Sequence, residues 1–270
     1  GEISGCYSVD FSIRADVSYS YSTDVVTYAY AGGLVCANGN SGVIENCYSI
    51  GSIRSYASSR ATGPINTHAT AEARAGGITA NNSGVIKNCY SVTDTYASAD
   101  KSSYTGSATK YEGIVCAVNI GTIENSYYVR KEYSNSQGVG MSYGQEAITE
   151  VTDSEIKSYD MIRRIDNPYS YIYQQDIYNS NNGYPILNTQ PNGTMGIVTS
   201  HKSGNYKGAF DLDIQLEFPN GGTYNLYYAV AGKNASFSPC LSPISITDKN
   251  TTIIAYVENA FNTKMRRIYK

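Results

Sequence analysis

A single sequence pattern recurs along the first half of the chain and constrains the fold more than any other feature. Its clearest form is GVIENCYSI at residues 42–50, which returns as GVIKNCYSV at 84–92 and as GTIENSYYV at 121–129. A shortened copy, ISGCYSV, occupies residues 3–9. Matched positions in these copies are 41, 42 and 37 residues apart, namely Cys6, Cys47, Cys89 and Ser126. A period of this length is typical of solenoids and propellers.

Each of the longer copies also carries an earlier apolar run, which reads GGLVCAN at 32–38, GGITAN at 76–81 and GIVCA at 113–117. One copy alone has too few apolar side chains to form a core, whereas copies stacked in register bury them together. Each strand then pairs with its counterpart about 4.8 Å away. The repeats therefore predict an all-β chain that begins with a short parallel β-helix. A propeller has a similar period, but three copies and a fragment are too few to close one.

The segments between the repeats are rich in tyrosine, which numbers 27 in the chain against 5 phenylalanines and no tryptophan. Residues 17–22 and 26–31 alternate with period two on either side of Thr23-Asp24, as the strands of a hairpin do. Weaker versions surround residues 62–64 and 100–102. We therefore expect each rung to extrude a hairpin, with the hairpins side by side in an extended sheet.

Past Val129 the repeat pattern stops, and the open end of a solenoid needs a cap. Residues 149–165 place Ile156, Tyr159, Ile162 and Ile165 on one helical face. Asp153 or Ser154 is the expected N-cap and Asn167-Pro168 the expected stop. This helix and the segment NNGYPIL at residues 181–187 are the predicted cap.

A second domain is predicted after the polar segment at residues 188–192. Strand-like runs occur at residues 210–218, 224–229, 244–247, 252–257 and 264–269, with turns between them. Their number and spacing fit an immunoglobulin-like β-sandwich. The expected division is thus a repeat domain with its cap at 1–190 and a sandwich at 191–270.

The paired glycines and the Ile-x-Asn-Cys-Tyr-Ser pattern resemble the GLUG repeat of bacterial surface proteins, over roughly residues 1–190. In that alignment Glu112 takes the place of Gly32 in the third copy, and Cys36 and Cys116 stand where the family commonly has glycine. The run from Tyr224 to Tyr256 is similar to the small C-terminal sandwich of some bacterial hexosaminidases. The first resemblance implies a secreted or cell-surface adhesin-like protein, and the second an accessory domain without catalytic residues.

Composition excludes several classes of partner. Charged residues make up 16% of the chain and the net charge is -3, so neither a basic stripe for nucleic acid nor an acidic tail is present. No apolar run approaches the roughly 18 to 20 residues that a membrane span needs. We expect no nucleic-acid partner, no membrane insertion and a monomer.

The cysteines are expected to be free thiols. Cys6, Cys47 and Cys89 would project in parallel from adjacent rungs, farther apart than a disulfide allows. Cys36 and Cys116 would lie two rungs apart, and Cys240 belongs to the other domain. Because a linear column does not converge on one point, no metal site and no cofactor are expected.

No catalytic centre is predicted either. His68 and His201 lie in polar surroundings without the sequence context of a nucleophile. Glu45 and Glu124 occupy copy-equivalent positions with Lys87 between them, which favours a solvated charge ladder over the paired acids of a glycosidase. Tyr48, Tyr90 and Tyr127 recur once per rung and are interpreted as structural ladder residues.

The remaining tyrosines form the candidate ligand-binding set: Tyr19, Tyr21, Tyr28 and Tyr30, with Tyr56, Tyr96, Tyr104 and Tyr111 in later extrusions. Stacked extrusions would gather these rings into an aromatic, hydroxyl-bearing surface suited to a sugar or a protein. Filling a thin sheet that is wet on one side is the competing role for the same side chains.

The sequence thus favours a non-enzymatic bacterial surface or secreted module for adhesion or presentation, which binds a host or bacterial glycan or protein. The alternative is a targeting or spacer region of a larger secreted glycosidase or peptidase.

Overall fold

The computed structural model describes residues 1–103, 105–132, 134–166, 172–176, 179, 181–187, 196–201, 204–205, 207–217, 224–231, 236–241, 243–247, 251–259 and 264–269. They fold into two compact units, residues 1–155 and 156–270. The predicted linker at 188–192 lies outside the described residues, so the boundary near residue 190 stays a prediction. The capping helix predicted at 149–165 is divided by the unit boundary, and residues 156–165 belong to the second unit.

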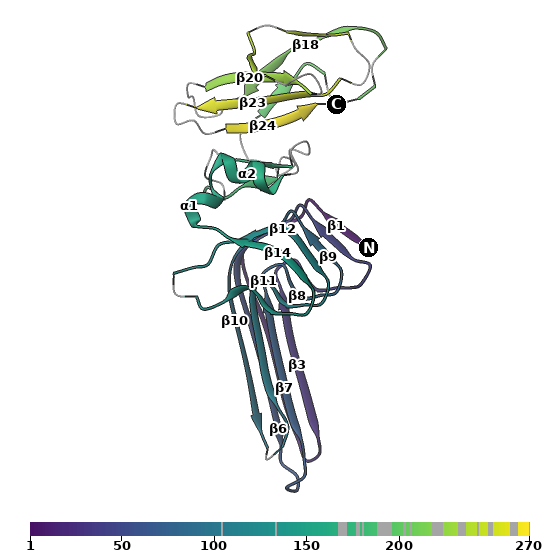
Figure 1. Ribbon diagram of the computed structural model, residues 1–270, viewed down its shortest axis with the longest axis vertical. Helices are drawn as coiled ribbons and strands as arrows, with labels where there is room; N and C mark the ends of the chain where they lie inside the picture. The colour runs from purple at the N-terminus through teal and green to yellow at the C-terminus, as the bar shows by residue number, and fades with distance from the viewer. Residues whose placement is uncertain are drawn as a thin grey trace. The chain divides into compact units, whose positions relative to one another are not determined.

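The first unit is a parallel β-solenoid built from two sheets (Figure 1). Sheet A has the order β1-β5-β9-β12-β10-β6-β2, with β14 beside β12. Its strands are β1 (Glu2–Ser4), β2 (Tyr7–Tyr21), β5 (Val43–Glu45), β6 (Tyr48–Ala61), β9 (Val85–Lys87), β10 (Tyr90–Ser102), β12 (Thr122–Tyr128) and β14 (Gln145–Glu150).

Sheet B has the order β3-β7-β11-β8-β4, with β13 beside β11. Its strands are β3 (Val25–Gly32), β4 (Val35–Asn38), β7 (Ala69–Gly76), β8 (Thr79–Asn82), β11 (Ala108–Asn119) and β13 (Gln137–Ser142). The pairings within both sheets are parallel, because each strand pairs with its counterpart in the next copy of the repeat.

The predicted stacking of matched positions is confirmed. Ile3 pairs with Ile44, Ile44 with Ile86, and Ile86 with Ile123, so the four side chains form one column. Ile44 and Ile86 are fully buried in a core that also contains Ile78 and Ile114. The isoleucines repeated in the sequence are therefore the spine of the solenoid interior.

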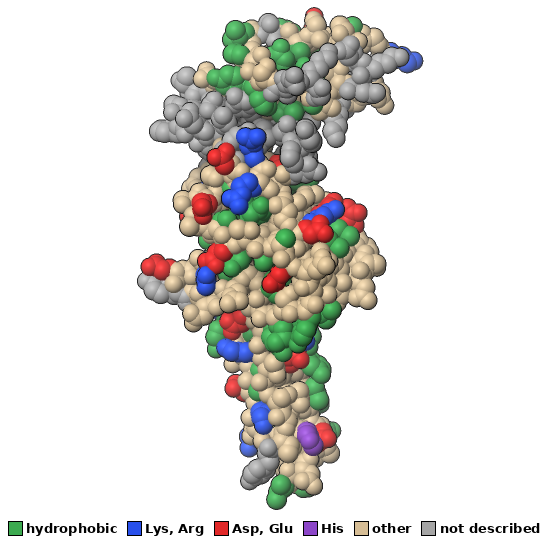
Figure 2. Space-filling model, in the orientation of Figure 1, with side chains coloured by type: hydrophobic (Ala, Val, Ile, Leu, Met, Phe, Trp, Pro, Cys, Tyr) green, Lys and Arg blue, Asp and Glu red, His purple; other side chains and the backbone are tan. Residues whose placement is uncertain are grey.

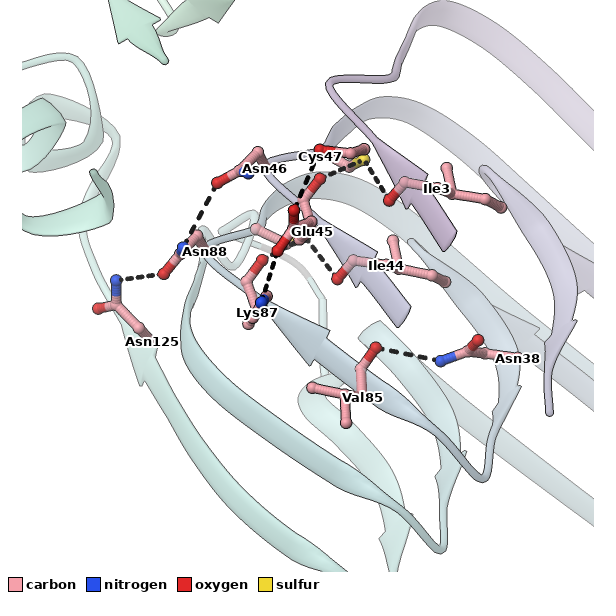
Figure 3. Close-up of polar contacts among 12 residues, drawn as sticks. Ile3, Asn38, Ile44, Glu45, Asn46, Cys47, Val85, Lys87, Asn88 and Asn125 are labelled. Atoms are coloured by element: carbon pink, nitrogen blue, oxygen red, sulfur yellow. Dashed lines mark hydrogen bonds and ion pairs between the residues drawn. The ribbon is translucent and has the colours of Figure 1, made fainter. Parts of the chain in front are cut away.

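A column of asparagine side chains lies at the turn that precedes each long strand of sheet A (Figure 3). Asn46, Asn88 and Asn125 adopt positive φ values of 55°, 52° and 40°, a left-handed conformation that asparagine tolerates better than most residues. Asn88 donates to Asn46 and Asn125 donates to Asn88 through their side-chain amides. The asparagine in the Ile-x-Asn-Cys pattern thus serves the turn that precedes each long strand.

The extrusions exist, but the predicted hairpins are wrong. β2, β6 and β10 run outward from the solenoid body in sheet A, and β3, β7 and β11 return in sheet B (Figure 1). We call this projection the arm. The strands on either side of each tip face one another across a thin core instead of pairing by hydrogen bonds. Small side chains allow the two sheets to approach closely, including Ala29, Ala57, Ala71, Ala73 and Ala97.

The repeat does not stop at Val129. β13 pairs with β11 and β14 pairs with β12, so both sheets continue without an arm. The sequence pattern did not predict this layer, because Glu146 takes the place of the repeated isoleucine and pairs in register with Ile123. The third copy is also shifted by one residue from the predicted alignment: Gly113, not Glu112, stacks on Gly76 and Gly32.

The helical segment is shorter than predicted. Residues 149–150 belong to β14, and two helices follow, α1 (Asp153–Ile156) and α2 (Tyr159–Ile165). Thr152 and Glu155 cap α1 reciprocally, and the Ser158 hydroxyl accepts the Met161 N–H at the start of α2. Ser158 is therefore the N-cap of α2. The predicted apolar face is real at Ile156, Ile162 and Ile165, which are buried.

The second unit continues with short strands. β15 (Tyr173–Gln174) pairs with β16 (Ile186–Leu187), which contains the end of the NNGYPIL segment. A four-stranded antiparallel sheet, β21-β20-β23-β24, is accompanied by the pairs β17–β19 and β18–β22. These strands are β17 (Gly196–Thr199), β18 (Phe210–Leu212), β19 (Ile214–Glu217), β20 (Tyr224–Val230), β21 (Ser238–Pro239), β22 (Ile244–Ile246), β23 (Ile253–Asn259) and β24 (Lys264–Tyr269).

Leu212, Ile214, Ile244, Ile253 and Ala255 form the apolar core of these strands. The five predicted strand-like runs thus coincide with strands of the structure. The immunoglobulin-like arrangement itself stays a prediction.

Candidate functional site

The candidate tyrosines lie on the arm, in two pairs on different strands. Tyr19 and Tyr21 belong to β2, and their rings stack with centroids 5.8 Å apart and planes 16° apart. Tyr19 pairs in register with Ser59, whose hydroxyl faces inward to Thr27 of sheet B. Tyr19 and Tyr21 therefore belong to the row of β2 that faces sheet B, although they are 57% and 54% exposed.

Tyr28 and Tyr30 lie on β3 and point the other way. Val25, Thr27, Ala29 and Ala31 face the arm core, so the alternate residues project from the outer face of sheet B. The Tyr28 and Tyr30 ring centroids are 5.8 Å apart and their planes are tilted by 51°. The structure thus brings each pair together but does not join the two pairs in one surface.

A cation lies between two tyrosines on the outer face of sheet B. Tyr30 pairs in register with Arg74, and Arg74 pairs with Tyr111 of the next rung. The guanidinium carbon is 4.8 Å from the Tyr30 ring centroid and 5.6 Å from that of Tyr111. Arg74 also contacts the side chains of Glu72 and Asn81. This row is a cation–π stack held in place by two polar partners.

The tyrosine hydroxyl of this row is held by a carboxylate. Tyr30 donates a hydrogen bond of 3.0 Å to Glu72. Burial, with a smaller contribution from this bond, raises the pKa of Tyr30 from 10.0 to about 12. Tyr28 pairs in register with Glu72 and is 54% exposed, so one ring of the pair remains open to a ligand.

Arg74 and Glu72 were absent from the predicted set. A signal for them was present, because Tyr30, Arg74 and Tyr111 each stand two residues before the glycines that stack in register, Gly32, Gly76 and Gly113. The one-residue error in aligning the third copy concealed this column.

The outer face of sheet A carries a related arrangement. The Arg14 guanidinium lies 4.4 Å from the Tyr56 ring centroid, and that of Arg54 lies 5.9 Å from the Tyr96 ring centroid. Arg54 also forms an ion pair of 2.6 Å with Asp94. Tyr56, Tyr96 and Tyr111 therefore lie on the arm as predicted, whereas Tyr104 lies outside the described residues.

The once-per-rung tyrosines form a stacked column at the base of the arm. Ring centroids are 5.4 Å apart for Tyr7 and Tyr48 and 4.8 Å apart for Tyr48 and Tyr90, with planes within 13°. Tyr48 and Tyr90 are fully buried, and Tyr127 pairs in register with Tyr90. Their interpretation as structural ladder residues is supported by this burial.

None of the six cysteines forms a disulfide, as predicted. Cys6, Cys47 and Cys89 form a column in which the Cys47 thiol donates to the Glu45 carbonyl and the Cys89 thiol to the Lys87 carbonyl. Cys36 is exposed, whereas Cys116 stacks on Thr79 and is buried, which raises its pKa to about 12.

The histidines and the carboxylates of the Glu45 column make local hydrogen bonds, ring contacts and ion pairs. His68 is exposed, and its backbone N–H donates to Asp24 at 2.8 Å. The His201 ring contacts the Ser200 hydroxyl and the Phe210 ring. Lys87 forms an ion pair of 2.6 Å with Glu45, and the hydrogen bond from Lys87 lowers the pKa of Glu45 (Figure 3). Glu124 follows in the same column.

Within the described part of the chain, no three His, Cys, Asp or Glu side chains come together as metal ligands would. None of its helices is both long and apolar enough to span a bilayer. Figure 2 shows cationic and anionic side chains interspersed along the visible face of the arm.

Comparison with known proteins gives a family-model match to a short part of the chain. Residues 27–54 match the model of the GLUG motif. The match spans β3, β4, β5 and the first half of β6, which is the passage from the arm through the solenoid body to the next long strand. No curated protein and no solved structure matches the chain.

Proposed function

We propose that this chain is a non-catalytic module of a secreted or cell-surface bacterial protein, and that it binds a glycan or a protein surface in adhesion or presentation. The observation that carries this proposal is the row on the outer face of sheet B, where Tyr28, Tyr30, Arg74 and Tyr111 lie on one rigid face of the arm. The GLUG match at residues 27–54 supports the bacterial surface setting.

The chemistry of the row suits such ligands. Tyrosine rings offer an apolar face to the C–H groups of a sugar or to an aliphatic side chain, and their hydroxyls offer hydrogen bonds. Arg74 and Glu72 add a charged donor and a charged acceptor beside Tyr30. Because paired strands hold these groups, little conformational entropy is lost on binding.

We assign the row of Tyr28 and Tyr30 as the primary binding surface, rather than that of Tyr19 and Tyr21. Tyr28 and Tyr30 lie on an outward face beside charged hydrogen-bonding groups. Tyr19 and Tyr21 instead belong to the row that faces the arm core. For residues 191–270 we propose an immunoglobulin-like accessory domain without catalytic residues.

A glycan array tests the proposal with two double variants, Tyr28→Ala/Tyr30→Ala and Tyr19→Ala/Tyr21→Ala. Tyr143→Ala is the matched control, because Tyr143 is 73% exposed and lies outside the arm. We expect the wild type and the control to bind the same glycans and the first double variant to lose them. Equal binding by the wild type and the first double variant, with unchanged circular dichroism, would remove the assigned surface.

A further inference from the structure

Strand β2 is an open edge of sheet A. Among the described strands, β2 pairs with β6 alone. The Tyr21 carbonyl accepts a hydrogen bond from the Thr62 N–H, on the β6 side. Because backbone groups alternate in direction along a strand, the odd-numbered residues between 11 and 21 direct their N–H and C=O groups to β6. The even-numbered residues direct theirs to the open edge: Ser12, Arg14, Asp16, Ser18 and Ser20.

The inward row of β2 is also uncovered. Val17 is 37% exposed and Tyr19 is 57% exposed, whereas Ala57 and Ser59, stacked directly on them in β6, are 2% and 1% exposed. β2 also carries larger side chains than β6 at most of these positions, for example Phe11 beside Gly51. An apolar row of this length at an open edge is a site where a further strand adds favourably.

The opposite edge of the arm is protected. On β10, the Ala97 N–H donates to Glu112 at 3.0 Å. The Ser136 hydroxyl contacts both Glu112 and the Thr95 carbonyl. The Ala97 N–H and the Thr95 C=O are therefore already hydrogen-bonded, to a carboxylate and a hydroxyl, and are not available to an added strand. The two edges of sheet A in the arm therefore differ, and of these two the β2 edge is the one open to pairing.

We propose that the β2 edge pairs with β2 of a second copy of this chain, antiparallel and centred on Ala15. In this register Arg14 lies opposite Asp16 of the second copy, and Ser12 lies opposite Ser18. These are the residues whose backbone groups face the open edge, so they form the hydrogen-bonded pairs of the new ladder. Ala15 then faces its own counterpart in a non-hydrogen-bonded pair.

Side chains on both faces fit this register. On the outer face, Arg14 of each copy lies opposite Asp16 of the other, so the dimer contains two such ion pairs between strands. In the single chain, Nε of Arg14 instead pairs with Oδ2 of Asp16 on the same strand, at 2.5 Å. On the inner face, Phe11 lies opposite Tyr19 and Ile13 opposite Val17, so the exposed apolar row becomes continuous. A second copy is thereby favoured over an unrelated strand, because β2 is complementary to itself.

The proposed dimer differs from the monomer expected from the sequence. It covers Tyr19 and Tyr21 but leaves the outer face of sheet B, with Tyr28 and Tyr30, free. The inference therefore stands apart from the proposed ligand site, and either can fail without the other.

Sedimentation equilibrium of the full chain under reducing conditions tests the register, with Arg14→Asp and Asp16→Arg as single variants. Each single variant places like charges opposite one another in its own homodimer, so we expect dimerisation to weaken at least about tenfold. An equimolar mixture of the two restores opposite charges at both positions, and we expect a heterodimer as tight as the wild-type dimer. Arg60→Asp, an equal charge change on β6, is the control and should leave the dimer intact.

Circular dichroism and thermal melting establish that each variant is folded. A wild-type chain that stays monomeric at every concentration would overturn the proposal, and would leave the edge to another occupant, such as a strand from a longer form of the chain. A mixture of the single variants that does not associate would overturn it as well. Dimerisation that ignores both substitutions would exclude β2 as the interface.

Discussion

The Nδ2 atom of Asn82 donates a hydrogen bond of 2.8 Å to Oδ1 of Asn119, while Oδ1 of Asn82 accepts one of 2.8 Å from Asn38. All three side chains are buried. The amides thus form a directional column through three copies of the repeat, in which each donates to the next. The same Nδ2 atoms also contact backbone carbonyls, so the column satisfies the turns that separate the two sheets.

Asn82→Asp should destabilise the solenoid by about 3 kcal/mol at neutral pH. The substitution keeps the acceptor for Asn38 but places a buried carboxylate oxygen against Oδ1 of Asn119 and the Thr122 carbonyl. Urea denaturation measures the loss. Asn40→Asp, at an exposed position in the equivalent turn of the neighbouring copy, is the control and should change stability little. Equal effects of the two substitutions would contradict a role for the column.

Gly77→Ala should also destabilise the fold, by about 1–3 kcal/mol. A Cβ at this position would overlap the Ile114 carbonyl oxygen and the hydroxyls of Ser91 and Thr93. Gly39→Ala serves as the comparison, because a Cβ there meets no atom within 4 Å. The melting temperatures of the two variants measure the difference. Equal melting temperatures for Gly77→Ala and Gly39→Ala would mean that the Ile114 carbonyl does not lie as close to Gly77 as the structure places it.

Thiol reactivity should separate the six cysteines by position. Cys6 and Cys36 are exposed and should react first with a chromogenic disulfide reagent in the native chain. Cys240 is partly exposed and should react more slowly, while Cys47, Cys89 and Cys116 should react only on unfolding. Burial raises the pKa of Cys116 to about 12 and raises that of Cys89 as well, so both remain thiols at neutral pH. Fewer than six reactive thiols after denaturation without reductant would reveal a disulfide that the stacking forbids.

Tyr30 should make stability fall in alkaline solution. Its pKa is raised from 10.0 to about 12 in the folded chain, so unfolding favours loss of its proton between these values. The stability that the neutral phenol contributes is present below pH 10 and is lost as the pH rises to about 12. Urea midpoints between these limits should fall less steeply for Tyr30→Phe than for the wild type. Tyr143→Phe, which removes an exposed hydroxyl, should follow the wild type.

The stacking of the solenoid could be predicted because identical residues recur where identical environments recur. Ile44, Ile86 and Ile123 face one core, and Asn46, Asn88 and Asn125 occupy one turn. Where the environment kept its shape but the residue changed, as at Glu146, the pattern gave no signal, and the last layer was missed.

The arm could be predicted only in part. Alternation of side chains at residues 17–22 and 26–31 indicates strands but does not say which strand each one pairs with. A hairpin and a two-sheet arm share the same local pattern, because both have one inward and one outward row. Contacts with neighbouring rungs favour the two-sheet arm over the hairpin, because small side chains such as Ala71 and Ala73 let the two sheets pack closely.

The candidate site shared this limit. Tyr28 and Tyr30 were found because tyrosine alternates along one strand, whereas Arg74 joins them only through the register of β3 with β7. Contacts between repeats depend on alignment to a single residue, and the shift at Gly113 was enough to conceal them.

A crystal structure of the chain would test the central claim most directly, through the hydrogen-bond partners of β2. The account predicts parallel pairing of β2 with β6, with Ile13 beside Ile53 and Tyr19 beside Ser59, and Ile3, Ile44, Ile86 and Ile123 in one column. Antiparallel pairing of β2 with β3 in a closed hairpin, or the four isoleucines in separate layers, would contradict it.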